Sequence, residues 1–173
     1  MLIAVEEFRK IVKTDIADDE LRTRLAALET AIRRYTNNRF TVRGSERKIE
    51  VRGGRIVLPS SFYIVGDSVE LQAEEYRDKV FNVTDMDGDV LTVDEDLRFE
   101  GEYTMALVQY PKDVVMGVVN LLKWDISNRE KVGVKSETIS RWSVTYYDMD
   151  TNALLGYPSS LLGFLKPYMK ARF

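Results

Sequence analysis

The hydrophobic period changes twice along this sequence, and that change constrains the fold more than any other feature. Up to Phe40, apolar residues recur every three or four positions, which is typical of α-helices with one buried face. From Phe40 to Gln109 they alternate with polar residues, as they do along the strands of a sheet. The helical spacing returns at Pro111. We therefore expect helices on both flanks of a β-rich middle.

The spacing predicts helices over residues 2–12, 18–37 and 111–127. One face of the second helix carries its large apolar residues, which are Leu21, Leu25, Leu28, Ile32 and Tyr35. An acidic start and an arginine-rich end suit the dipole of this helix, and Asn37-Asn38 favours a left-handed stop.

The third predicted helix opens at Pro111, where a helix tolerates proline best. It is apolar nearly all round, so we expect it to be buried, either within the chain or against neighbouring subunits. Gly117 inside it costs roughly 1 kcal/mol relative to alanine. Close packing of another backbone against Gly117 is a compensation for that cost.

Two glycine-containing turns organise the middle of the chain. Gly53-Gly54 separates two strand-like runs and predicts a tight hairpin, and Asp87-Gly88 does the same further on. With Val69–Leu71 and the β-rich stretch Tyr103–Gln109, the pattern gives five or six short strands. We expect a small antiparallel sheet or barrel at about 41–109.

Beyond the third helix, the sequence predicts a polar loop over 128–138, a strand over 142–147 and a final helix from Pro158. Pro167 lies inside the apolar stripe of that helix and kinks or restarts it. We expect 158–173 to be a docking segment for a portal or a neighbouring subunit, although the same stripe also suits packing on the chain's own core. The candidate interface residues are Leu161, Leu162, Phe164, Leu165, Tyr168, Met169, Lys170 and Arg172.

The residue inventory narrows the possible chemistry. The chain has no histidine and no cysteine, so it lacks the commonest general base, the commonest metal ligand and any thiolate. No phosphate-binding glycine loop is present, and Asp85–Asp89 fails the spacing of an EF-hand calcium loop. We therefore predict no enzyme activity and no catalytic, cofactor-binding or metal-binding residues; a carboxylate-dependent hydrolase is the surviving alternative in that class.

Charge is distributed unevenly. Residues 20–58 hold ten Arg/Lys against four Asp/Glu, a net of +6, whereas residues 64–110 hold three against thirteen, a net of −10. Such asymmetry suits a protein that meets copies of itself or a charged partner, and it also suits a solvated acidic β surface. The arginines of 20–39 lack the interleaved aromatics of a nucleic-acid interface, which leaves a DNA-binding regulator as a weaker alternative.

Three stretches resemble, in order and spacing, the head–tail connector (adaptor) family of long-tailed double-stranded DNA phages. The first is Ala31–Phe40, at the end of the second helix. The second starts at Tyr110-Pro111 and continues through Val132–Thr138 to Trp142–Tyr146. The third is Tyr157–Tyr168. The β-rich middle is longer than in the compact helical members of this family.

The resemblance implies a single connector domain over 1–173, with an α+β fold: a mainly α-helical connector-type core and a β-rich antiparallel insertion between the second and third helices. It implies a virion protein of the head–tail neck, made in the host bacterial cytoplasm. The implied assembly is a ring, twelvefold in the virion, between the portal protein and a stopper or tail-completion protein. Genomic DNA passes through the ring without sequence-specific binding. The family has no catalytic residues to carry over.

Further expectations follow from the charges and the apolar third helix. We expect the ring to be weak or absent in free subunits, to be completed on the portal, and to have an acidic or mixed channel lined by part of 64–110. Another neck or stopper protein remains the main alternative. No apolar run approaches the ~20 residues of a membrane span, and Met1–Glu7 lacks the features of a signal peptide.

Overall fold

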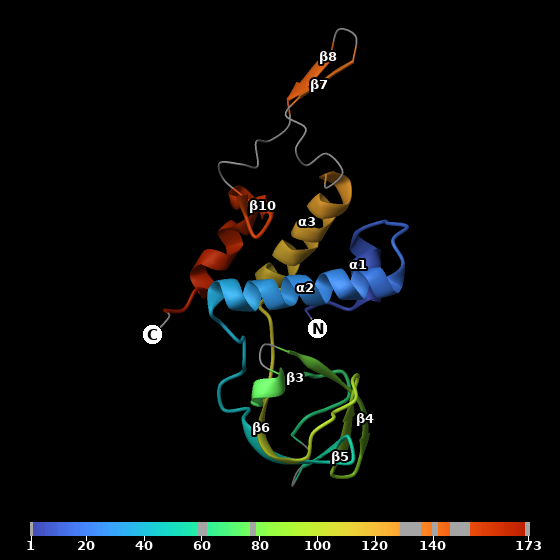
Figure 1. The fold of residues 1–173 in the computed structure, drawn as a ribbon, viewed down its shortest axis with the longest axis vertical. Helices are drawn as coiled ribbons and strands as arrows, with labels where there is room; N and C mark the ends of the chain where they lie inside the picture. The colour runs from blue at the N-terminus through green and yellow to red at the C-terminus, as the bar shows by residue number, and fades with distance from the viewer. Residues whose placement is uncertain are drawn as a thin grey trace. The chain divides into compact units, whose positions relative to one another are not determined.

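The computed structural model describes residues 2–58, 62–76, 79–128, 136–139, 142–145 and 153–171, which divide into two compact units (Figure 1). The barrel unit is Asn37–Tyr110, and the helical unit combines Leu2–Thr36 with Pro111–Phe173. None of the helices in the described part of the chain has the length and apolar content that a membrane span requires.

The three helices of the helical unit lie where the apolar spacing predicts them. They are α1 (Val5–Ile11), α2 (Asp18–Thr36) and α3 (Lys112–Asn128). The predicted face of α2 is buried at Leu21, Leu25, Leu28 and Ile32. Asn37 has a φ of 50°, which confirms the left-handed stop after α2.

The final helix differs from its prediction. Residues Ser159–Tyr168 form a 3-10 helix, η3, rather than an α-helix. η3 also explains Gly117, because a Cβ added at Gly117 would lie 2.4 Å from ring carbons of Phe164. The neighbour that requires a glycine is therefore an aromatic side chain and not a second backbone. Glycine is retained in α3 because it makes room for this ring.

Two short antiparallel pairs complete the helical unit. β7 (Ser136–Ile139) pairs with β8 (Trp142–Thr145), and β9 (Ala153–Leu154) pairs with β10 (Tyr157–Pro158). The strand predicted from Trp142 is confirmed as far as Thr145. The loop predicted over 128–138 is wrong at both ends, where α3 and β7 take its residues, and 129–135 lies outside the described residues.

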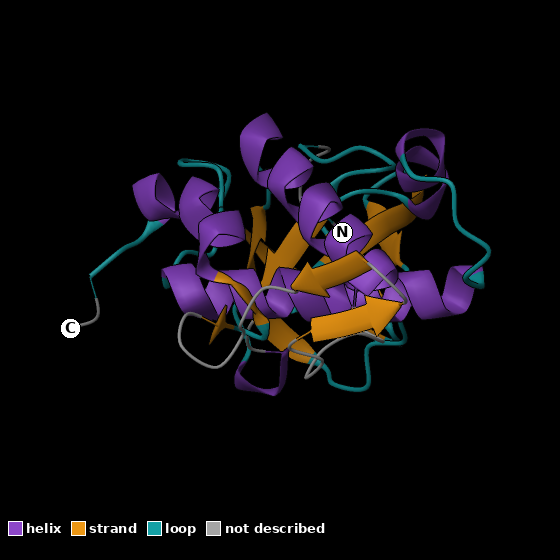
Figure 2. Ribbon diagram, turned by 90° about the horizontal axis from the view of Figure 1, so that it is seen from above, coloured by secondary structure: helices purple, strands orange, loops and turns teal. Residues whose placement is uncertain are grey.

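The barrel unit is built from six antiparallel strands (strands are orange in Figure 2). They are β1 (Arg47–Arg52), β2 (Arg55–Val57), β3 (Ser68–Leu71), β4 (Phe81–Asp87), β5 (Val90–Val93) and β6 (Gly101–Leu107). The hydrogen-bonded order is β1-β2-β5-β4-β3-β6, and β6 returns to β1, so the barrel is closed. A short 3-10 turn, η1 (Glu74–Tyr76), lies between β3 and β4.

Both predicted hairpins are present. Gly53 and Gly54 link β1 to β2 with φ values of 57° and 74°, the left-handed pair that a two-residue turn requires. Gly88 has a φ of 58° at the start of the turn between β4 and β5. The alternation of apolar residues thus predicts the strands, and the glycines fix where the chain reverses.

The predicted fold class, a mainly α-helical connector-type core, is wrong. The β-rich segment closes into a six-stranded barrel with a hydrophobic core of its own. Its fully buried side chains include Ile56, Tyr63, Val69, Leu71, Phe81, Leu91 and Met105. Closure of the sheet into a barrel explains why the prediction failed. A closed sheet buries its own interior without covering helices, so it forms a core that is independent of the helical one.

Tyr63 anchors the chain between β2 and β3 inside the barrel unit. Its side chain is fully buried, and its hydroxyl lies 2.8 Å from the carbonyl oxygen of Ser45 and 2.9 Å from that of Met105. Burial raises the pKa of the Tyr63 phenol to about 12, against the nearby positive charge of Arg47, which lowers it.

The raised pKa of Tyr63 predicts alkaline unfolding of the barrel. Because the unfolded phenol ionises near pH 10 and the folded one near 12, its contribution to stability is complete below pH 10 and is lost as the pH rises towards 12. We expect the urea midpoint to fall across this range. Tyr63→Phe, which has no ionisable group at this position, should be less stable than the wild type at pH 7. Its urea midpoint should fall less than that of the wild type between pH 10 and 12. Parallel curves for the two proteins would contradict this assignment.

Candidate functional site

The predicted docking residues occupy two environments. Leu162 and Leu165 are buried, with 3% and 0% of their surface exposed. Leu161, Phe164 and Tyr168 are half-buried, whereas Met169 and Lys170 are exposed. Arg172 lies outside the described residues. The structure thus brings part of the predicted stripe into the chain's own core and leaves its last members on the surface.

Specific contacts hold the segment against the helical unit. The Phe164 ring fills the space above Gly117, and the Tyr168 hydroxyl lies 2.8 and 2.9 Å from the two carboxylate oxygens of Asp113. That hydrogen bond raises the pKa of Tyr168, because the carboxylate stabilises the protonated phenol. The backbone N–H of Lys170 donates to the carbonyl oxygen of Thr36 at 2.8 Å. Of the predicted docking residues that the structure describes, Met169 and the Lys170 side chain are the most accessible to a partner.

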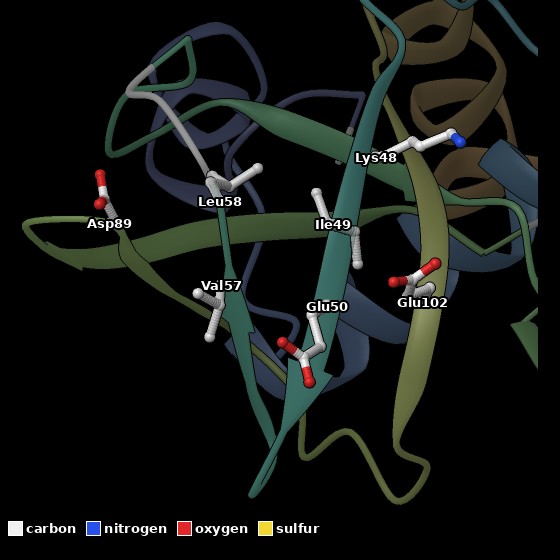
Figure 3. Close-up of a pocket in the computed structure, with 7 residues that line it drawn as sticks. All are labelled: Lys48, Ile49, Glu50, Val57, Leu58, Asp89 and Glu102. Atoms are coloured by element: carbon white, nitrogen blue, oxygen red, sulfur yellow. The ribbon is translucent and has the colours of Figure 1, made fainter.

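A groove on the barrel is the second candidate surface (Figure 3). It arises because β1 and β2 pair over three residues only, from Arg52↔Arg55 to Glu50↔Val57. The N–H of Leu58 then donates to the carbonyl oxygen of Asp89, which directs the chain away from β1. The groove has a volume of about 360 Å³ and is lined by Lys48, Ile49, Glu50, Val57, Leu58, Asp89 and Glu102.

Carboxylates dominate the rim of this groove. Glu50 on β1 lies directly opposite Glu102 on β6, an arrangement of like charges that costs stability unless a cation is near. Arg52 supplies that cation, with its Nη2 atom 2.7 Å from Oε1 of Glu50. Within the described residues there is no cluster of three or more acidic side chains placed to hold a metal ion. The carboxylates of the groove therefore attract a cationic partner.

The net charge differs between the two structural units, whose boundaries do not coincide with the segments 20–58 and 64–110. The barrel unit has nine Arg/Lys and fifteen Asp/Glu, a net of −6, while the helical unit has sixteen and thirteen, a net of +3. β1, from the basic segment 20–58, pairs directly with β6, from the acidic segment 64–110, over Arg47↔Met105 to Val51↔Gly101. The contrast predicted between 20–58 and 64–110 is consequently not a contrast between two separate surfaces.

The sequence reasoning missed an exposed apolar cluster. Phe62, Ile64 and Val65 expose 45%, 67% and 56% of their surface in the loop before β3. Leu155, in the turn between β9 and β10, exposes 43%. The run Phe62–Val65 is visible in the sequence, but four consecutive apolar residues ordinarily indicate a buried strand. Only the fold reveals that three of the four face outward.

No protein-family model matches this sequence, and no curated protein matches it either. The family resemblance therefore rests on the three stretches described above.

Proposed function

We propose that this chain is a head–tail connector (adaptor) subunit of a long-tailed phage. In this role it forms a ring under the portal, twelvefold in the virion, which links head to tail and leaves a channel for DNA. The observation that carries the proposal is the location of the three resembling stretches. Most of each stretch belongs to the helical unit, namely the end of α2, α3 with β7 and β8, and β10 with η3, while Asn37–Phe40 and Tyr110 belong to the barrel unit.

Contacts between these stretches support the proposal. Gly117 and Asp113, from the second stretch, meet Phe164 and Tyr168, from the third. Thr36, from the first, accepts the hydrogen bond of Lys170, which lies just beyond the third. These contacts join parts of all three stretches within one packed unit. The barrel unit lies between α2 and α3 in the sequence and is a second compact unit with a hydrophobic core of its own.

The charge of the barrel suits a protein through which DNA passes. Tight phosphate contacts would add affinity and hold the DNA, whereas a unit with a net charge of −6 repels the phosphate backbone. The partners in this proposal are the portal protein, a stopper or tail-completion protein and further copies of the chain, in a neck assembled in the bacterial cytoplasm.

The test is binding to the portal protein encoded in the same genome. We expect the purified chain to co-sediment with assembled portal and to add a ring of density under it in electron micrographs. A variant with Met169→Asp and Lys170→Glu, both exposed positions, should bind less while keeping the wild-type melting temperature. Lys13→Glu, an exposed charge change elsewhere, is the control. Absence of portal binding at every salt concentration would refute the connector function.

A further inference from the structure

We propose that the barrel unit of one copy inserts an apolar tip into a groove on α2 of a second copy. The tip is Phe62, Ile64 and Val65, and the groove is lined by Ala27, Thr30, Ala31, Arg34, Tyr35 and Leu155. This inference deepens the proposed function, on which it rests for the ring, and it identifies the contact between successive subunits.

The tip is held rigidly in its exposed position. The N–H of Ile64 donates to Oδ2 of Asp67 at 2.9 Å, and the N–H of Asp67 donates back to the carbonyl oxygen of Ile64 at 3.1 Å. The N–H of Gly66 donates to the carbonyl oxygen of Val83, which ties the turn to β4. A surface ordered before binding loses little conformational entropy when it docks.

Tyr63 anchors the tip to the barrel core. Its ring is buried in the barrel core, whereas its two neighbours in the sequence, Phe62 and Ile64, have exposed side chains. The Phe62 ring packs edge-on against Tyr63 and lies under the guanidinium of Arg47, 4.2 Å from the ring centroid. Ile64 and Val65, the two most exposed apolar residues of the tip, are therefore presented by a rigid base.

The groove on α2 offers small and apolar side chains to the tip. Its volume is about 620 Å³, and the small side chains of Ala27 and Ala31, one helical turn apart, lie along it. Tyr35 and Leu155 supply larger apolar surface. Arg34 is the charged residue among those that line it.

Leu155 gives an independent reason to regard the groove as a contact surface. It occupies the first position of a two-residue turn, with a φ of 55°, followed by Gly156 at 79°. Asparagine or glycine adopts this left-handed conformation at lower cost than leucine. The leucine side chain is nevertheless placed there, 43% exposed and lining the groove. Its strain and exposure are both compensated if a second copy covers it.

Charge favours the same pairing between copies. Asp67 and Glu46 place negative charge near Tyr63. Arg47 has a larger effect on the Tyr63 pKa than either carboxylate and places positive charge beside Phe62, so the local charge of the tip is mixed and the pairing rests on the net charges of the units. The groove belongs to the helical unit, whose net charge is +3, and the tip to the barrel unit, whose net charge is −6. Tip and groove are different patches, so the contact is heterologous, and repetition of a heterologous contact generates a ring when the rotation closes.

The natural absence of cysteine makes a direct test possible. Val65→Cys and Ala27→Cys are prepared as separate chains, mixed at high concentration and low salt, and treated with a short bifunctional maleimide. We expect a covalent dimer in the mixture. Adding Ile64→Asp to the Val65→Cys chain should reduce the yield to background. Ala26→Cys, the exposed neighbour of Ala27 that is not among the groove-lining residues, is the matched control for α2, and Thr84→Cys is the control for the barrel.

Each outcome decides the proposal. A mixed dimer that exceeds both controls supports it, and a mixture that gives no more product than the controls overturns it. Dimers of Val65→Cys alone would mean that two tips meet each other, which also overturns it. A chain carrying both Val65→Cys and Ala27→Cys that crosslinks only within itself would place the contact inside one copy and refute the proposal as well.

The crosslink and the portal assay separate this contact from the connector function. A mixed dimer without portal binding would support the tip-and-groove contact and refute the connector function. Portal binding without a mixed dimer would do the reverse.

Discussion

Truncation after Tyr157 is expected to destabilise the helical unit severely. It removes Leu162 and Leu165, which are buried, and Phe164, which packs on Gly117. Burying a large apolar side chain contributes about 1.5–3 kcal/mol, so the two leucines alone account for about 3–6 kcal/mol. That is a large share of the roughly 5–15 kcal/mol by which a protein is stable. The measurement is thermal unfolding followed by tryptophan fluorescence, because Trp124 and Trp142 both belong to the helical unit.

A shorter truncation is the matched control. Ending the chain after Tyr168 keeps all of η3 and removes exposed residues such as Met169, at the loss of the backbone hydrogen bonds from Met169 to Lys166 and from Lys170 to Thr36. We expect its melting temperature to stay close to that of the wild-type chain. If the truncation after Tyr157 melts like the wild type, the segment does not stabilise the helical unit and acts only through partners.

The two truncations also separate folding from docking. The segment 158–173 was expected to bind a portal or a neighbouring subunit, and its buried members now give it a second role in the chain's own core. A loss of portal binding in the shorter truncation, without a loss of stability, would place docking on residues 169–173. A loss that appears only with unfolding would leave the segment a structural role.

Arg39→Ala is expected to destabilise the barrel unit by about 3 kcal/mol. Glu70 on β3 is fully buried, and Nε of Arg39 lies 2.7 Å from its Oε1. Removing one member of a buried ion pair typically costs about 3–5 kcal/mol, since the other charge loses a close partner. The lower end applies because the Arg39 side chain is 45% exposed, and water reaches the pair. Urea unfolding followed by far-UV circular dichroism measures the change.

A second substitution should rescue this variant. Arg39→Ala combined with Glu70→Met removes the buried charge together with its partner, and such replacements are often neutral or stabilising. Arg43→Ala, at an exposed arginine four residues along, is the control and should change stability little. If the double variant is as unstable as Arg39→Ala, the loss does not come from an uncompensated carboxylate.

The sequence alone determined the three α-helices, the two glycine hairpins and the β-rich character of the middle. The spacing of Leu21, Leu25, Leu28 and Ile32 placed α2, and the alternation around Gly53-Gly54 and Asp87-Gly88 placed two hairpins correctly. These features are local, because helix periodicity, strand alternation and turn conformation depend on residues close in the chain. The extent of the β-rich middle was predictable for the same reason.

Only the tertiary structure decided how these elements close and what they expose. The pairing of β6 with β1 joins residues some fifty positions apart, and no local pattern distinguishes an open sheet from a closed barrel. The Phe164 ring over Gly117, the burial of Leu162 beside the exposure of Met169, and the outward-facing Ile64 and Val65 are likewise settled by long-range packing. The sequence does not distinguish a buried apolar side chain from an exposed one, because burial depends on what the rest of the chain places around it.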